Sequence, residues 1–149
     1  DDGFFKITAR KKDMFKTSDG KYVVPSLIEN QLKQSRFIEQ VIVIGEGQKM
    51  PAAIIQPNFE FVKEWIEKKH KKINTDYTSI CESLIIINRI QREVDKANKN
   101  FGQWEQVKKF ELSPEIWSID AGHLTPTMKI KRKIVKEKYK DLINKIYNF

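Results

Sequence analysis

The sequence predicts an α+β domain, in which a small, mainly antiparallel central sheet is flanked by helices and preceded by an N-terminal two-stranded hairpin. Three observations support this fold class. Residues 41–44 are a β-branched run, and residues 51–57 form an apolar return after a flexible turn. An Asp-Gly pair at residues 19–20 separates two short stretches that suit strands. Several later segments carry apolar residues at helical spacing.

The N-terminal part of the chain favours short strands. We expect one strand around residues 4–8 and a hairpin over residues 13–24, because Asp-Gly is a strong tight-turn signal. Pro25 should end the hairpin, and a short helix should follow it. The spacing of Ser26 and Glu29 is typical of a capping box, with Ser26 at the N-cap and Glu29 reaching back to the first turn.

The central sheet is predicted from two adjacent segments. Residues 37–45 have the composition of a buried strand, and residues 51–57 are the expected antiparallel return. Asn58 then suits the N-cap of a helix. The apolar positions of that helix recur at helical spacing: Phe59, Val62, Trp65 and Ile66.

The second half of the chain should be largely helical. After a linker at residues 71–75, one long amphipathic helix or two abutting helices should end near Gly102. Residues 104–112 suit a strand beside the earlier pair, and residues 113–115 have helix-start chemistry. A terminal helix is predicted from its apolar stripe: Val135, Tyr139, Leu142 and Ile146.

The composition is that of one folded domain. The chain has 149 residues, of which 40% are hydrophobic and 11% aromatic, enough for a buried core. No apolar run approaches the ~20 residues of a membrane-spanning helix. The acidic start lacks the apolar region of a signal peptide. We therefore expect a cytoplasmic protein, with peripheral association with a membrane left open.

A metal site within these residues is not expected. His70, His123 and Cys81 lack metal-ligand spacing. The single Cys81 cannot form an internal disulfide, which fits a reducing compartment, and its place in a helical segment favours a buried thiol. The tryptophans are expected in the core or at a domain interface: Trp65, Trp104 and Trp117.

The net charge of +8 raises the question of nucleic-acid binding. The chain lacks an RNP-type aromatic motif, a GxxG loop and a zinc pattern, so nucleic acid is not an expected partner. Many lysines stand near glutamates on predicted helix faces, as in Glu64 and Lys68, which is typical of a solvated surface. A basic module for nucleic acid or an anionic membrane remains the alternative from another functional class.

Two lysine-bearing loops carry the strongest chemical signal. Residues 8–23 and residues 124–132 mix lysine and arginine with Gly, Ser and Thr beside short strands. Ammonium groups supply charge, while hydroxyls and backbone N–H groups supply directed hydrogen bonds, so both loops suit a phosphorylated ligand.

Together and in this order, these loops resemble those of the C-terminal domain of acyl-adenylate-forming enzymes, and specifically of long-chain fatty acid–CoA ligases. Residues 15–25, followed by Ile28-Glu29, are close to a signature of that branch, and residues 124–132 match its catalytic-lysine loop. Ala9 stands where the family usually has Gly or Asp, and Met128 where the wider superfamily has Gly. Neither departure touches the charged positions.

The resemblance implies a division of the chain. Residues 1–12 would be the end of a large domain together with the hinge, and residues 13–149 a mobile C-terminal domain. The large N-terminal domain, which binds ATP and the acyl chain, would lie outside these residues, so the fragment alone should be inactive. The intact ligase would use ATP, Mg²⁺ and CoA with a fatty acid, and its own N-terminal domain would be the partner of this one. An adenylate-forming ligase for another carboxylic acid is the alternative within the family.

The resemblance also implies residue roles. Lys129 would be the catalytic lysine of acyl-adenylate formation, Lys12 the hinge residue and Arg10 a contact to the ribose of the nucleotide. The alternative for each is a solvent-facing charge in a basic run.

In the thioester-forming half of the reaction, Gly20, Lys21 and Tyr22 would lie near the pantetheine arm of CoA. Gly20 would let the backbone approach that narrow arm, and the alternative is that it only supplies a positive φ to the hairpin.

Overall fold

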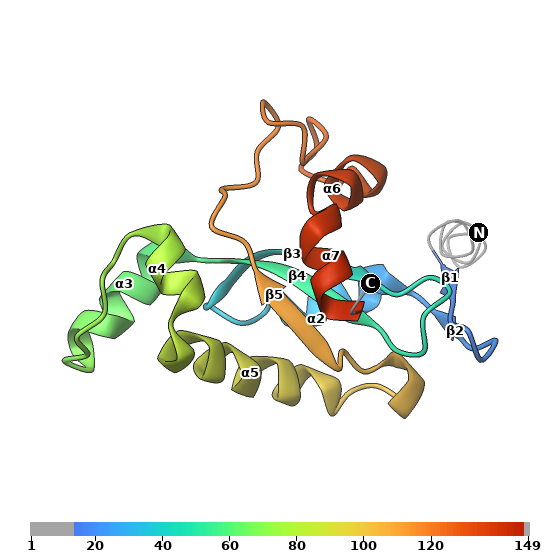
Figure 1. Ribbon diagram of the computed structural model, residues 1–149, viewed down its shortest axis with the longest axis horizontal. Helices are drawn as coiled ribbons and strands as arrows, with labels where there is room; N and C mark the ends of the chain where they lie inside the picture. The colour runs from blue at the N-terminus through green and yellow to red at the C-terminus, as the bar shows by residue number, and fades with distance from the viewer. Residues whose placement is uncertain (1–13, 148–149) are drawn as a thin grey trace, which may run out of the picture.

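The computed structural model describes residues 14–147, and these form two small sheets with helices on both sides of the larger one (Figure 1). The strands are β1 (Phe15–Lys16), β2 (Tyr22–Val23), β3 (Ile38–Ile44), β4 (Ala52–Pro57) and β5 (Lys109–Leu112). The helices are α2 (Pro25–Leu32), α3 (Phe59–Lys68), α4 (Tyr77–Glu82), α5 (Leu84–Asn98), the 3-10 turn η1 (Gln103–Glu105), α6 (Arg132–Lys138) and α7 (Lys140–Tyr147). The predicted fold class is confirmed, whereas the strand expected at residues 4–8 lies outside the described residues.

Strand β4 is the centre of the larger sheet, whose order is β3-β4-β5. It pairs antiparallel with β3, as predicted, and all six of its residues are buried. It pairs parallel with β5, in the register Ile54 with Glu111. A parallel partner needs a long crossover, and α3, α4 and α5 supply it.

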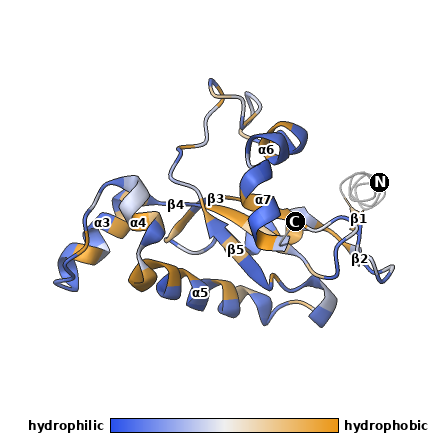
Figure 2. Cartoon of the chain, viewed as in Figure 1, coloured by the Kyte–Doolittle hydropathy of each residue, from blue (hydrophilic) through white to orange (hydrophobic). Residues whose placement is uncertain are grey.

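The two faces of this sheet bury different clusters, which explains the continuous apolar run in its strands. On one face, Val41, Val43 and Ile55 pack with residues of α2, α3 and α5. On the other face, Ile42 and Ile54 pack with residues of α6 and α7. Burying one such side chain contributes about 1.5–3 kcal/mol, so helices on both faces stabilise the sheet. Figure 2 shows the apolar stripe along α5 and the apolar central strands.

Most of the predicted helices are confirmed. The side chain of Asn58 accepts a hydrogen bond from the Phe61 N–H at 3.1 Å and caps α3. The long amphipathic segment is two abutting helices, separated where Ser83 adopts an extended backbone. Cys81 lies in α4, and burial raises the pKa of its thiol to about 12, so the group stays protonated at neutral pH.

Three boundaries were predicted wrongly. The segment 104–112 is extended only from Lys109, because Trp104 belongs to η1. No helix begins at residues 113–115, although the Ser113 hydroxyl accepts the Glu115 N–H at 3.3 Å and also donates to the Tyr139 hydroxyl at 2.8 Å. The terminal helix is two helices, because the backbone leaves the helical region at Tyr139.

The predicted capping box at the start of α2 is also wrong. Helix α2 begins at Pro25, after an extended Val24, and no side chain caps it. The Glu29 carboxylate turns away from the helix start and accepts the Val43 N–H of β3 at 2.8 Å. It also receives both terminal nitrogens of Arg132, at 2.7 and 2.5 Å. Glu29 is 4% exposed, and burial raises its pKa while Arg132 opposes that shift.

We expect Glu29→Ala to lower the free energy of unfolding by about 3 kcal/mol, because it removes the acceptor of the buried Val43 N–H and the buried carboxylate that pairs with Arg132. Urea denaturation of the 149-residue chain would measure this loss. Lys145→Ala is the control, since the Lys145 side chain is 68% exposed and its pair with Glu111 should be worth no more than about 1 kcal/mol. A Glu29→Ala cost equal to that of the control would contradict the assignment.

Candidate active-site loops

The C-terminal lysine loop is closed by a short antiparallel bridge between Leu124 and Ile130. Thr125 organises the interior of the loop. Its backbone N–H donates to the Lys129 carbonyl at 2.8 Å, and its hydroxyl accepts the Lys129 N–H at 3.0 Å. The Thr127 hydroxyl lies 3.1 Å from the same oxygen. The two threonines of the motif therefore hold the backbone around Lys129.

Lys129 is exposed, and it stands in this loop directly before the closing Leu124–Ile130 bridge. Among the described residues the structure records no salt bridge that involves it. Its neighbour Met128 has a φ of 67°, a left-handed conformation that costs a non-glycine residue roughly 1–2 kcal/mol. This conformation is the physical reason why a glycine suits that position. The Met128 side chain is exposed beside the lysine.

His123 fixes the base of the loop. Its backbone carbonyl accepts the Lys131 N–H at 2.9 Å, and its own N–H donates to the Ser118 carbonyl at 3.0 Å. Its Nδ1 accepts the Ser118 N–H at 3.2 Å, so the neutral ring carries its proton on Nε2. Burial lowers the pKa of His123, and the nearby Glu115 carboxylate partly opposes the shift.

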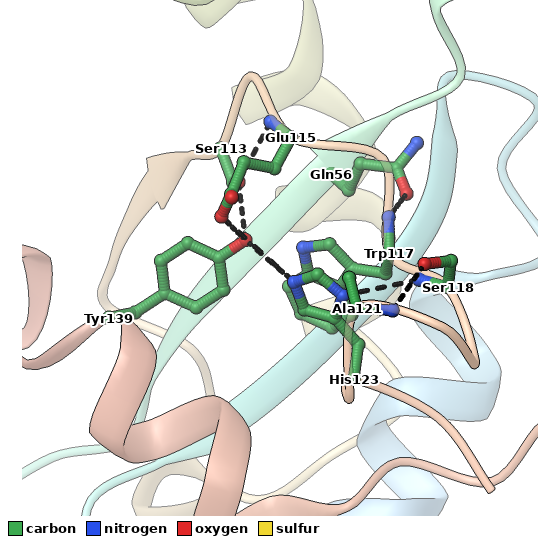
Figure 3. A network of polar contacts seen from close by, with 8 residues as sticks. All are labelled: Gln56, Ser113, Glu115, Trp117, Ser118, Ala121, His123 and Tyr139. Atoms are coloured by element: carbon green, nitrogen blue, oxygen red, sulfur yellow. Dashed lines mark hydrogen bonds and ion pairs between the residues drawn. The ribbon is translucent and has the colours of Figure 1, made fainter.

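The hydroxyl of Tyr139 is the centre of a polar network beneath His123 (Figure 3). It donates to Glu115 Oε1 at 2.7 Å and accepts from the Ser113 hydroxyl at 2.8 Å. His123 Nε2 lies 3.4 Å from the Tyr139 oxygen and is its third hydrogen-bonding neighbour. Burial raises the pKa of Tyr139, so the phenol remains neutral and keeps its donor role.

Trp117 connects this network to the central sheet. Its indole stacks on the His123 ring, with centroids 5.6 Å apart and an interplanar angle of 3°. Its backbone N–H donates to Gln56 Oε1 of β4 at 3.1 Å (Figure 3). Beyond the loop, Arg132 is held by Glu29. The loop therefore has a rigid base on both sides and an exposed tip.

The N-terminal hairpin is the second candidate loop. Phe15 pairs with Val23 and Lys16 with Tyr22, and the turn between them is closed by the Gly20 N–H and the Thr17 carbonyl at 3.0 Å. Gly20 has a φ of 83°, which confirms that the turn needs a positive φ there. A Cβ at Gly20 would meet only the Lys16 side chain, at 3.8 Å, so conformation and not crowding within the domain requires the glycine. Whether the backbone also approaches a ligand there stays a prediction.

The structure does not bring the predicted site residues together. Lys21 and Tyr22 are exposed on the hairpin, whereas Lys129 lies on the loop that projects beyond α6, on another side of the domain (Figure 1). Arg10 and Lys12 lie outside the described residues.

Within residues 14–147, no helix combines the length and the apolar character that crossing a bilayer requires. In the same part of the chain, no three His, Cys, Asp or Glu side chains gather as a metal-ligand set.

Two groups of important residues escaped the sequence analysis. Glu29 was interpreted as a local cap, and its distant partner Arg132 was one charge in a basic run. The stack of Trp117, His123 and Tyr139 joins residues whose side chains meet only after folding. The available signal was that Trp117 and His123 both stand shortly before the lysine loop. Of the tryptophans, Trp117 is buried as expected, but Trp104 is 47% exposed.

The sequence matches the family described as the AMP-binding enzyme C-terminal domain over residues 12–149. Among curated relatives, it is 35% identical over 148 residues to the long-chain-fatty-acid–CoA ligase FadD15 of Mycobacterium tuberculosis, covering 99% of this chain and 25% of that protein. It is 35% identical over 149 residues to human long-chain-fatty-acid–CoA ligase 1, covering 98% of this chain and 21% of that protein. The chain therefore spans about a fifth to a quarter of the length of these relatives.

Solved structures share the fold. The adenylation domain of a carboxylate reductase from Mycobacterium chelonae has a TM-score of 0.73 at 19% identity, covering 94% of this chain and 20% of that one. A fatty acyl CoA synthetase of Mycobacterium tuberculosis has a TM-score of 0.52 at 21% identity, covering 86% of this chain and 20% of that one.

We expect the stability of the domain to fall as the pH drops below about 6.5, the ordinary pKa of His, because the folded state holds His123 neutral while the unfolded chain takes up a proton. A single group of this kind contributes a slope of at most about 1.4 kcal/mol per pH unit. Urea denaturation between pH 5 and pH 7 would measure the slope, and His123→Gln should flatten it. His70→Gln is the control, since His70 is exposed and should leave the slope unchanged. Equal slopes in the wild type and His123→Gln would refute the expectation.

Proposed function

This chain belongs to the family of AMP-binding enzyme C-terminal domains, and on that basis we propose that it is the mobile C-terminal domain of a long-chain fatty acid–CoA ligase. The intact protein would first join a fatty acid carboxylate to the α-phosphate of ATP, releasing pyrophosphate. The thiol of CoA would then attack the acyl carbon of the adenylate and release AMP. The main support is that curated long-chain-fatty-acid–CoA ligases align with 98–99% of this chain. The exposure of Lys129 agrees with the proposal.

The cofactors of the proposed enzyme are ATP with Mg²⁺, and CoA. Because residues 14–147 offer no cluster of metal-ligating side chains, we assign Mg²⁺ to the ATP phosphates and the remainder of the protein. The large N-terminal domain would be the partner of this one, with residues 1–12 as the connecting segment and residues 13–149 as the mobile body. A cytoplasmic location is part of the proposal, and it is supported by a single cysteine that has no second cysteine to pair with in this sequence.

The exposure of Lys129 supports its proposed role in the first half-reaction. A carboxylate and a phosphate repel each other, and negative charge builds at the transferring centre, so a positioned ammonium lowers the barrier. Because Lys129 is exposed, its ammonium could approach a nucleotide bound to another domain, and its long stem suits a narrow cleft. The rigid base restricts the loop before it docks, which reduces the entropy lost on ordering.

The separate positions of the two loops support a rotation between two orientations. A rigid domain cannot present Lys129 and the Gly20 turn to one site from the same orientation when they lie on different sides of it (Figure 1). In this proposal Lys12 absorbs the backbone rotation, and Arg10 stays near the ribose of the nucleotide. The hairpin with Gly20, Lys21 and Tyr22 then lies against the pantetheine arm during thioester formation.

In the full-length enzyme, Lys129→Ala should lower acyl-adenylate formation by roughly 10²–10³-fold, because the transition state loses its cation. ATP–pyrophosphate exchange with a fatty acid would measure this step. Thioester formation from supplied acyl-adenylate should stay close to wild type. Lys133→Ala is the matched control, an exposed lysine on the adjacent helix that should leave both steps unchanged. Equal damage to both half-reactions would count against the role of Lys129.

Lys12→Pro should preserve acyl-adenylate formation and block thioester formation, since proline fixes the backbone of the hinge. Lys12→Ala should support both half-reactions, because a hinge needs backbone freedom and not the ammonium group. Single-turnover assays of each half-reaction would test the pair. Normal overall turnover in Lys12→Pro would argue that the pivot lies elsewhere.

A further inference from the structure

The β1–β2 hairpin is too small to hold its own position. Its ladder has only two residue pairs, and the two strands form a sheet of their own, apart from β3-β4-β5. An isolated two-stranded hairpin is at best marginally stable in water. The orientation of the Gly20 turn therefore depends on contacts from elsewhere in the chain.

Each strand of the hairpin is held by a different segment. On the β1 side, the Gly47 N–H donates to the Lys16 carbonyl at 2.9 Å, and the Ser18 N–H donates to the Gln48 carbonyl at 2.9 Å. On the β2 side, the indole N–H of Trp104 donates to the Tyr22 carbonyl at 3.2 Å. The Lys21 ammonium lies 5.7 Å from the centroid of the same indole. Trp104 thus contacts the two residues that directly follow Gly20.

The turn that carries Trp104 is rigid. The Asn98 side chain donates to the Val107 carbonyl and accepts the Val107 N–H, both at 3.0 Å, and so joins the end of α5 to the segment before β5. The Gln106 side chain donates to the carbonyls of Asn98 and Phe101, at 3.1 and 3.3 Å. These hydrogen bonds join the backbone of the turn that carries Trp104 to the end of α5 and to the segment before β5.

The absence of a side chain at Gly102 leaves room for the Trp104 indole. Its φ of −66° is accessible to any residue, so no backbone reason requires glycine there. A Cβ at this position would lie 2.9 Å from Cζ3 of Trp104 and 3.0 Å from Cη2. The indole ring therefore lies against the bare backbone of Gly102, and a methyl group would push it away.

We infer that Trp104 is a positioning residue, which fixes the Gly20 turn and, through it, the thioester-forming orientation of the domain. The inference rests on the proposed function of the hairpin. Trp104 is 47% exposed, so it contributes less to the core than a buried tryptophan would, while its contact with the hairpin is direct. Misplacing a positioning element by about 1 Å can cost up to 10²-fold in rate, even when folding is unaffected.

The test uses two variants of the full-length enzyme, and each disturbs the contact between Trp104 and the Tyr22 carbonyl in a different way. Trp104→Phe removes the N–H that bonds the Tyr22 carbonyl, and Gly102→Ala shifts the indole through its added methyl group. In both, hydrogen exchange at the amides of Gly20 and Lys21 should become faster. Thioester formation from supplied acyl-adenylate should fall by about tenfold, well within the range that misplacement produces. ATP–pyrophosphate exchange should stay at the wild-type level.

A double-variant cycle makes the assignment specific. In a Trp104→Ala background, Gly102→Ala should add no further loss, because the ring that the methyl group would meet is gone. Leu84→Ala is the control, since it removes a large exposed apolar side chain at the start of α5 and should change neither exchange nor rate.

Unchanged amide exchange in Trp104→Phe and Gly102→Ala would overturn the inference, whatever the hairpin does in catalysis. Equal loss of both half-reactions would overturn it too, because that pattern indicates a general structural role. Faster exchange with unaltered thioester formation would overturn the catalytic part, and it would also identify the proposed role of the hairpin as the error.

Discussion

The buried Glu29 carboxylate ties the central sheet to the segment that follows the lysine loop. It lies on α2, accepts the outward N–H of Val43 on β3, and binds the guanidinium of Arg132 directly after the lysine loop. One buried acid therefore joins three segments that are far apart in the sequence. It also gives the buried Val43 N–H, on an edge strand of the sheet, the acceptor that no neighbouring strand supplies. Such a pair contributes geometry more than stability, because removing two charges from water offsets much of their attraction.

The two-sided sheet explains how one small domain can present two separate loops. Strand β4 is buried on both faces, so helices and connections must cover each of them. The face covered by α6 and α7 supports the lysine loop through Trp117, His123 and Tyr139. The hairpin with Gly20 lies beyond the other end of the sheet and is held by short turns (Figure 1). Because the core between them is closely packed, the spacing of the two loops is fixed, and a change of orientation must move the domain as one body.

In this domain, hydrogen-bonded networks lie next to the loops that carry the proposed functional residues, and those residues themselves are exposed. His123 and Tyr139 satisfy each other's polar groups beneath the lysine loop, and Asn98 and Gln106 do so within the turn that carries Trp104. Lys129, Lys21 and Tyr22 are exposed above these supports. This arrangement suits residues that act on a ligand held by another domain, since the support limits the entropy lost on docking while the side chain can still reach outward.

Several elements could be predicted from the sequence because each depends only on residues that are close together along the chain. The Asp-Gly turn, the Asn58 cap, the antiparallel pair of apolar strands and the amphipathic helices all follow from neighbouring residues, and the motif around Lys129 indicated the family. The tertiary structure alone decided which distant side chains meet. Glu29 has the spacing of a helix cap, yet it binds Arg132, because burial favours an ionic partner over a solvated helix end. Ser113 has helix-start chemistry and accepts the Glu115 N–H, yet its hydroxyl also donates to Tyr139 and no helix follows. Trp104 was expected in a strand and in the core or at a domain interface, and the structure shows that it contacts the hairpin. No sequence spacing encodes these contacts, since each depends on where the packed sheet and helices place its two partners.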